Sequence, residues 1–377
     1  MIRCSNCMLP ETHETISFDQ EGVCNICRQH EFKQDKIDWK SKEKDLITLI
    51  DQYKGKYDYD CIIPFSGCKD STFTLYKLVK DYDVRPLVVS YDHHFYRPKT
   101  LKNVDRVIRI LGVDYIKYRT NWNVIKKTMK ETFLRKGDFC WHCHAGVFAY
   151  PMQIAVKHNI PLIFWGEKSS EYTSYYGYEE EEEVDEKRFN MWVNLGITAE
   201  DMAGMINEPL RNLNCFRYPS LKDLRAIKCR SVCLGSYIPW DVKKQSKLIM
   251  DELGWEGDQV EGIPSKYPYE KVECMLTGIR DYIKYIKRGY ARTSHLTSLD
   301  IRNHRMKREE AEKLVETYEG KRPETLDLFL KMIDITEDEF IKIAMAHCIS
   351  PYNHDPNKTK LGKKLYDQDQ WDWSDIK

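Results

Sequence analysis

Short apolar runs alternate with helical patterns from about residue 57 to residue 200 of this chain of 377 residues. Four of these runs predict buried strands, at residues 61–63, 87–89, 115–116 and 162–165. Apolar residues also recur at spacings of three and four from Leu101 to Leu111 and stop at Gly112, which predicts a helix and its end. The repetition of strand, helix and strand indicates an α/β fold with a doubly wound parallel sheet.

Helical patterns dominate after about residue 200, where the strand signal fades. Apolar residues from Ala311 to Tyr318 form one helical face that ends before Gly320, and residues 336–339 match a capping box. These features predict a helical C-terminal region. The acidic run at residues 179–183 predicts a solvated loop or flap, because adjacent like charges repel and resist packing.

The segment Ser66-Gly67-Cys68-Lys69-Asp70-Ser71 lies between the first predicted strand and a helical pattern. Backbone N–H groups at the start of a helix carry the positive end of the helix dipole, so such a loop binds phosphate without a basic side chain. Ser66 and Ser71 add hydroxyl donors. Asp70 orients the loop or helps to hold Mg²⁺, and Lys69 contacts phosphate or points into solvent. The alternative is an ordinary turn in which Asp70 and Ser71 cap the helix.

This segment closely resembles the S-G-G-x-D-S signature of the PP-loop ATP pyrophosphatases. The resemblance implies a parallel sheet flanked by helices, with ATP split into AMP and pyrophosphate and the loop holding the pyrophosphate. It makes all six residues candidate ATP contacts, and Lys69 and Asp70 candidate catalytic residues. Cys68 replaces the second glycine of the signature, so its side chain either crowds the phosphates or is a tolerated variant.

Polar residues follow two predicted strands at the edge of the sheet where ligands bind in a doubly wound fold. Ser90, Asp92 and His93 end the second strand, and Gly166 and Glu167 follow the fourth. The first three and Gly166 are therefore candidate nucleotide contacts. Glu167 is a candidate catalytic residue for handling a metal, ammonia or a proton; the alternative is a glutamate that caps a helix or forms a salt bridge.

Two C-x-x-C pairs, Cys4 with Cys7 and Cys24 with Cys27, are separated by sixteen residues near the N-terminus. This spacing matches structural zinc sites, in which four thiolates close a tetrahedron around Zn²⁺. We predict a structural role, because a segment this short does not fold without a metal ion that links its cysteines. The odd total of 13 cysteines favours metal ligation in a reducing compartment over a set of disulfides.

A third pair, Cys140 and Cys143, precedes a helical pattern in the sheet domain and needs further ligands to hold a metal. Cys229 and Cys233 are the candidates, for a second zinc ion or an iron–sulfur cluster. The alternative is that these cysteines are reduced and buried, and behave as small hydrophobic residues.

Several further motifs are spread over nearly the whole chain. With the N-terminal cysteine pairs, they are residues 61–71, Cys140-x-x-Cys143-His144, residues 165–167, residues 234–241, residues 300–302 and residues 308–310. Together they resemble the bacterial N-acetyl sugar amidotransferases of lipopolysaccharide and flagellin-glycan biosynthesis. The resemblance implies that ATP and ammonia convert an acetamido group of a sugar into an acetamidino group. The amide oxygen would attack the α-phosphorus of ATP, and ammonia would displace AMP from the resulting imidate.

The same resemblance implies an acetamido sugar that is nucleotide-linked or similar to sialic acid. Candidate contacts for this substrate are Tyr237, Trp240, Asp241, Arg302, Arg305 and Arg308. The alternatives are surface charges for the arginines and a core position for Trp240. The chain has no G-x-C-x-G glutaminase motif, so we expect ammonia from a separate glutaminase with a cyclase-like subunit.

Four regions follow from these patterns. They are a cysteine knuckle at residues 1–33, a helical linker at 34–56, a PP-loop domain at 57–240 and a helical substrate or partner region at 241–377. No apolar run approaches the length of a membrane span, and no signal peptide precedes Cys4, so we expect a soluble cytoplasmic protein.

The net charge of the chain indicates which classes of partner it can bind. Lysine plus arginine and aspartate plus glutamate both total 59, so the formal net charge is zero, which argues against nucleic acid as a partner. The balance also disfavours the main alternative function, a tRNA-thiolating PP-loop enzyme that uses Cys140, Cys143 and Cys229. A second alternative, prompted by Cys68, is a non-catalytic zinc-binding scaffold.

Overall fold

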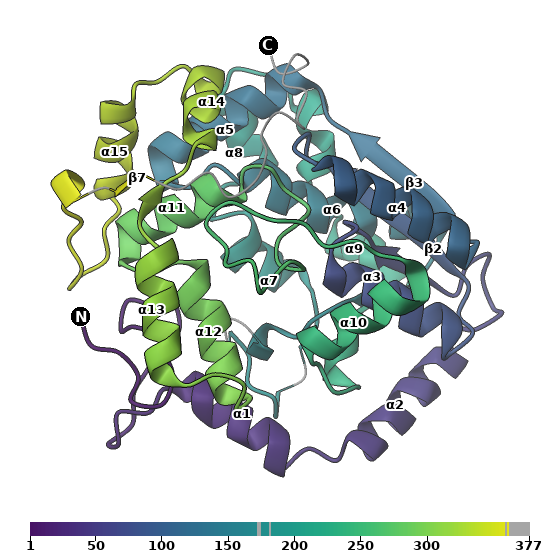
Figure 1. The fold of residues 1–377 in the computed structure, drawn as a ribbon. Coiled ribbons are helices and arrows are strands. Elements are labelled where there is room, and N and C mark those ends of the chain that lie inside the picture. Colours follow the sequence, from purple (N-terminus) through teal and green to yellow (C-terminus); the bar gives the residue numbers. More distant parts are fainter. Residues whose placement is uncertain (172–174, 181, 359, 362–377) are drawn as a thin grey trace.

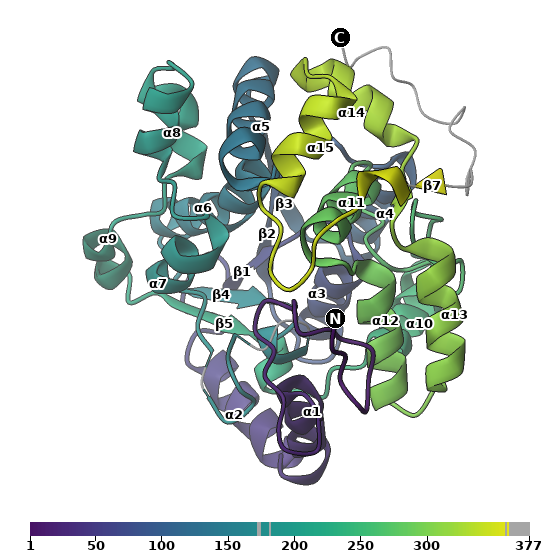
Figure 2. The ribbon, with the colours of Figure 1, turned by 90° about the vertical axis from the view of Figure 1, so that its left-hand side faces the viewer.

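A five-stranded parallel sheet forms the centre of the computed structural model, which describes residues 1–171, 175–180, 182–358 and 360–361 (Figures 1 and 2). Its strand order is β3-β2-β1-β4-β5. The strands are β1 (Cys61–Pro64), β2 (Pro86–Asp92), β3 (Asp114–Arg119), β4 (Leu162–Trp165) and β5 (Arg230–Cys233). The order reverses at β1, because β2 and β3 extend the sheet on one side of this strand and β4 and β5 on the other.

Helices cover both faces of the sheet, because successive residues of a strand point to opposite sides. Ile63 and Val88 face a core shared with four helices, α2 (Trp39–Asp51), α3 (Lys69–Lys80), α4 (Pro98–Leu111) and α10 (Val242–Leu253). Ile62 and Val89 face another core, which includes residues of α6 (Trp141–His158). The predicted doubly wound α/β fold is confirmed.

Two strands differ from the prediction. The strand at residues 115–116 was expected to be buried, but β3 is an edge strand with mostly exposed residues, held by six residue pairs with β2. The sequence does not predict β5, which pairs with β4 over four residues. Both strands depend on backbone hydrogen bonds to one neighbour, and an edge strand can form this ladder without a continuous apolar run.

The predicted helices are present. α4 ends at Gly112, whose φ of 62° is left-handed, and α15 (Glu337–Met345) begins at the predicted capping box. α13 (Arg308–Tyr318) ends two residues before Gly320. The predicted helical linker contains the end of α1 (Asn25–Asp35) and the whole of α2.

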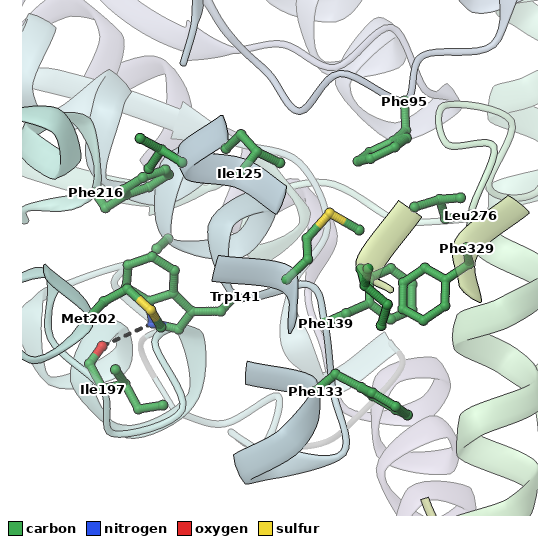
Figure 3. Packing of buried hydrophobic residues seen from close by; sticks show 14 of the residues in the cluster. Phe95, Ile125, Phe133, Phe139, Trp141, Ile197, Met202, Phe216, Leu276 and Phe329 are labelled. Atoms are coloured by element: carbon green, nitrogen blue, oxygen red, sulfur yellow. Dashed lines mark hydrogen bonds between the residues drawn. The ribbon is translucent and has the colours of Figure 1, made fainter. Parts of the chain in front are cut away.

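The C-terminal helices share a core with α5 (Trp122–Lys136) and α6. This core includes residues of α11 (Thr277–Arg288), α14 (Thr325–Ile333) and α15. Figure 3 shows Phe329 of α14 near Phe133 and Phe139, with ring centroids 6.0 Å and 4.6 Å away. On the other side of this core, the Trp141 indole N–H donates to the Ile197 carbonyl at 3.0 Å (Figure 3). The C-terminal region therefore packs directly onto the sheet domain.

Six further elements complete the α-helices and strands of the described residues. They are α7 (Glu186–Arg188), α8 (Ala199–Met205), α9 (Leu221–Ala226), α12 (Arg292–Arg302), β6 (Lys321–Arg322) and β7 (Lys360–Leu361). None of the described helices combines the length and the apolar character needed to cross a membrane. Glu181 of the acidic run and residues 362–377 of the predicted C-terminal region lie outside the described residues.

Candidate active site

The loop between β1 and α3 lies at the point where the strand order reverses, the usual ligand position in this kind of sheet. Gly67 has a φ of +76°, and a Cβ there would lie 2.5 Å from Val104 Cγ2, so this position requires glycine. The Trp255 indole N–H donates to the Gly67 carbonyl at 3.0 Å. No side chain caps the start of α3, so its first N–H groups can bind an anion.

Cys68 occupies the N-cap of α3 with a φ of −72°, a conformation that any residue adopts. The backbone here therefore does not need the second glycine of the PP-loop signature. The Cys68 sulfur lies 3.5 Å from Ser71 Oγ, and Ser66 Oγ lies 3.3 Å from the same oxygen. Burial and the charge of Glu273 raise the pKa of the Cys68 thiol to about 11, so the thiol is protonated near neutral pH and is a poor nucleophile.

A cavity of about 400 Å³ lies at the start of α3 and has two walls of different origin. The sheet wall consists of Lys69, Asp70, His144 and Glu167. The helical wall consists of Glu270, Lys271, Arg280, Asp281, Lys284, Arg292 and His295, from α11, α12 and the segment before them. The rest of the lining comes from His13 and Glu14 of the N-terminal segment, from Phe148 and Ala291, and from Ser169, Tyr175, Arg188, Trp192 and Val193.

Lys69 joins the two walls. Its Nζ lies 2.9 Å from Asp70 Oδ2 and 2.9 Å from Glu270 Oε2, and the residue is 3% exposed. Burial by itself would raise the pKa of Glu270, but the charges of Lys69 and Arg292 lower it to about 2. Glu270 is therefore ionised at neutral pH and holds Lys69 in place. Asp70 Oδ1 is buried without a hydrogen-bond partner among the described residues, which suits an oxygen ligand for a cation.

Glu167 has the pKa of a proton-transfer group. Burial, and then the negative charge of Asp70, raise this pKa to about 7, while Lys271 acts in the opposite direction. A carboxyl group with this pKa exchanges its proton readily near neutral pH. The preceding residue, Gly166, packs closely on α3, because a Cβ there would lie 3.1 Å from Thr74 Oγ1.

Arg280 differs from the other cations of the cavity. Those that pair with a carboxylate are Lys69, Arg188, Lys271, Lys284 and Arg292. Among the described residues, Arg280 has neither an ion pair nor a side-chain hydrogen bond. Arg280 belongs to no motif of the sequence, and only the packing of α11 brings it to the cavity.

Three predicted nucleotide contacts have protein partners instead of lining the cavity. Asp92 is fully buried and forms ion pairs with Lys117 at 2.8 Å and Arg119 at 2.7 Å. Ser90 Oγ donates to the Phe65 carbonyl. The His93 ring lies 4.3 Å from the ring of Tyr96, and burial lowers the pKa of His93 to about 4.

The predicted substrate contacts lie in three separate places. Trp240, Asp241 and Arg305 line a hollow of about 30 Å³ that also touches Glu270, and Arg305 forms an ion pair with Asp241. Tyr237 lines a different hollow, together with residues of α2. Arg302 and Arg308 lie at the N-terminal cysteine pairs instead, where the Arg308 guanidinium donates to the carbonyls of Cys4, Ser5 and Cys7.

The four N-terminal cysteines form one buried group. Their sulfurs lie within 4.8 Å of one another, and Cys4 Sγ accepts the backbone N–H groups of Cys7 at 3.4 Å and Cys24 at 3.2 Å. This all-sulfur donor set fits a four-coordinate metal ion such as Zn²⁺.

The other cysteine pairs do not form a second group of this kind in the described parts of the chain. Cys140 and Cys143 lie at the start of α6, where the charge of Cys274, after burial, contributes to a raised pKa of Cys143. Cys229 and Cys233 pack in a different core, at the two ends of β5. The cysteine that approaches Cys143 is therefore Cys274, for which no role was predicted.

Comparison with known proteins gives matches over parts of the chain. Residues 261–372 match the model for the C-terminal domain of WbpG-like LPS biosynthesis proteins. An uncharacterised protein of Methanocaldococcus jannaschii is 25% identical over 115 residues, which cover 30% of this chain and 41% of that protein. The chain thus spans about two fifths of the length of this curated relative.

Two solved structures are similar over larger parts of the chain. NMN synthetase from Francisella tularensis has a TM-score of 0.25 at 10% identity, covering 57% of this chain and 87% of that one. The U34-tRNA thiolase NcsA from Methanococcus maripaludis, solved with its 4Fe-4S cluster, has a TM-score of 0.29 at 12% identity, covering 94% and 99%. Likenesses at this level carry no argument about function.

Proposed function

We propose that the protein is an ATP-dependent amidotransferase of the PP-loop superfamily, which converts the acetamido group of a sugar into an acetamidino group in surface-polysaccharide or flagellin-glycan synthesis. One observation carries the proposal: the phosphate loop and a helical wall that matches an LPS biosynthesis domain contribute to the same cavity. The Lys69–Glu270 ion pair joins the two parts. A nucleotide on the loop and a sugar on the helical wall would therefore meet in one space.

The first step would be activation of the amide. The acetamido oxygen attacks the α-phosphorus of ATP, and the bond from this phosphorus to pyrophosphate breaks, which leaves an O-adenylated imidate. The leaving pyrophosphate gains negative charge, which the first N–H groups of α3 and the Lys69 ammonium group stabilise. Asp70 would hold Mg²⁺, which neutralises charge on the phosphates.

The second step would be displacement of AMP. Ammonia adds to the imidate carbon and loses a proton, and AMP leaves with the electrons of the carbon–oxygen bond. Glu167 is the proposed proton acceptor, since its pKa of about 7 keeps part of it ionised at neutral pH. The ammonia would come from a separate glutaminase with a cyclase-like subunit.

Arg280 is the proposed contact for an acidic group of the substrate. A guanidinium group binds a carboxylate or phosphate through two parallel hydrogen bonds, and Arg280 is the cavity cation that has no such partner among the described residues. Lys284 follows four residues later on α11 and therefore adds positive charge on the same face.

The test is an assay of the purified protein with ATP, Mg²⁺, ammonium and acetamido sugars, both nucleotide-linked and sialic-acid-like. We expect AMP together with a product in which oxygen has been replaced by NH, identified by mass spectrometry. AMP formation that requires tRNA would contradict the proposal and support the thiolating enzyme. Absence of turnover with every acceptor would support the scaffold, and a Lys69→Met variant controls for contaminating activity.

A further inference from the structure

The segment between the two N-terminal cysteine pairs forms part of the cavity, although its sequence suggests only a structural role. His13 and Glu14 line the cavity beside Lys284 and His295. Glu14 Oε1 lies 3.4 Å from Lys284 Nζ, and the Tyr290 hydroxyl donates to Glu14 Oε2 at 2.6 Å. The rings of His13 and His295 are stacked with centroids 6.4 Å apart. This segment therefore helps to position charged groups of the helical wall.

Residues 1–24, all of which the structure describes, contain turns and isolated bridges but no helix or longer strand. Their order must come from the four sulfurs and from contacts with other elements. The Arg308 guanidinium donates to the carbonyls of Cys4 at 2.8 Å and Cys7 at 3.1 Å. The Met8 N–H donates to Ser298 Oγ of α12 at 3.1 Å. The cysteine segment is thus docked on the C-terminal helices, close to α12 and α13 in Figure 2.

Arg302 lies four residues after Ser298, so it is on the face of α12 that contacts the cysteine segment. Its Nε and Nη1 atoms are buried and have no hydrogen-bond partner among the described residues. A buried guanidinium is strongly unfavourable unless negative charge lies beside it. The Met8 contact with Ser298, one turn earlier on α12, and the contacts of Arg308 with the Cys4 and Cys7 carbonyls bring this side of the helix to the cysteine segment.

Four thiolates around a divalent metal ion carry excess negative charge, which Arg302 can balance. We propose that the cysteine centre is a clasp on the cavity: bound metal, with Arg302 as its counter-charge, fixes the N-terminal segment on α12 and so holds His13 and Glu14 in the cavity wall. Arg302 is then a positioning residue for the metal centre and does not contact substrate. The inference requires a metal at the cysteines but not the amidotransferase activity, so the two proposals fail separately.

Zinc release tests the role of Arg302. Full-length protein reconstituted with Zn²⁺ is mixed with a coloured chelator, and wild type is compared with Arg302→Met, Arg302→Lys and Arg109→Met. Arg109 is the control, an α4 arginine with a 77% exposed side chain. We expect Arg302→Met to release Zn²⁺ about 10- to 100-fold faster than wild type, Arg302→Lys to show a smaller effect, and Arg109→Met to match wild type.

Equal release rates for wild type and a folded Arg302→Met variant, with unchanged circular dichroism and melting temperature, would overturn the counter-charge role. Where the methionine variant does not fold, the lysine variant carries the comparison: release faster than that of Arg109→Met supports the role, and equal release overturns it.

Hydrogen exchange of the wild type with and without Zn²⁺ tests the clasp itself. We expect peptides that cover residues 8–16 and the start of α12 to lose protection when Zn²⁺ is removed. Peptides from β1 and α3 should keep theirs, because the central sheet holds them. Unchanged exchange at residues 8–16, or loss of protection throughout the protein, would overturn the clasp.

Discussion

The two walls of the cavity differ in how their charged groups are held. Lys69 and Asp70 of the sheet wall begin α3, which follows β1, and Glu167 follows β4, so the central sheet and its helix fix the backbone of all three. Their charges act on one another, and Glu167 acquires a pKa of about 7. Arg280 of the helical wall carries a permanent charge without a carboxylate partner among the described residues. A carboxyl group whose pKa lies near neutral pH suits proton transfer, and a cation without an ion pair suits the binding of an anion. We therefore propose that the sheet wall carries out the reaction and that the helical wall recognises the substrate.

Replacing Glu167 by glutamine gives the most direct test of the sheet wall. Removal of a general base is expected to lower kcat by about 10²- to 10⁴-fold with little change in KM for the sugar. In the wild type, activity should fall as the pH drops through about 7, because only the ionised form of Glu167 accepts a proton. Steady-state pH profiles of AMP formation measure both effects. If Glu167→Gln keeps the same acidic limb, the base belongs to another residue and the assignment of reaction to this wall is weakened.

A Gly67→Ala substitution tests the backbone conformation of the loop that precedes Lys69 and Asp70. The left-handed backbone is expected to cost about 1–2 kcal/mol of unfolding free energy. The contact with Val104 adds about 1–3 kcal/mol, because the new Cβ would lie 2.5 Å from Cγ2. Gly55→Ala is the matched control, since Gly55 has a φ of +72° and nothing within 4 Å of a new Cβ. Urea denaturation of both variants isolates the contact, and equal losses would show that the loop does not depend on α4.

Substitution of Arg280 by glutamine tests the helical wall. Loss of a charged hydrogen-bonding group is expected to cost about 1.5–3 kcal/mol, which is about 10- to 100-fold in KM for an acidic sugar. The value of kcat should change much less. Lys284→Gln is the comparison, and we expect a smaller effect because Lys284 already pairs with Glu14. Steady-state kinetics with varied sugar decide the matter: a fall in kcat at constant KM would place Arg280 in the chemical step and erase the difference between the walls.

The smallest effect is expected for Cys68→Gly. Glycine is acceptable at an N-cap, so the unfolding free energy should change by less than about 0.5 kcal/mol. The φ of −72° means that the loop does not need glycine at this position. Thermal denaturation and the KM for ATP are the measurements. An increase in ATP turnover of more than about tenfold would show that the thiol crowds the phosphates and limits the sheet wall.

Sequence patterns were most informative where a function depends on neighbours along the chain. The spacing of Cys4, Cys7, Cys24 and Cys27 predicted a common site, and their sulfurs do converge. The segment at residues 66–71 was expected between a strand and a helix; residues 66–68 lie there, and residues 69–71 form the first turn of α3. In both cases the geometry is local, because a C-x-x-C turn and a helix N-terminus are each built from a few consecutive residues.

Patterns along the chain do not show which partner a residue meets through distant packing. Arg302 and Arg308 were predicted as substrate contacts, but the structure places them at the cysteine segment, about three hundred residues away in sequence. Asp92 follows a strand at the ligand edge, as expected, yet ion pairs with β3 occupy its carboxylate. A motif shows which residue types are present, but it does not show which charge lies opposite each of them.

By itself, the sequence determined the parallel sheet, the loop between β1 and α3 and the four-cysteine group, because these arise from local periodicity and short spacings. Only the tertiary structure decided that α11, α12 and the segment around Glu14 close a cavity over that loop. The physical reason is that ion pairs and burial act between groups that the chain brings together only on folding. Glu167 acquires a pKa of about 7, and Arg280 comes to line the same cavity, only when both walls are in place.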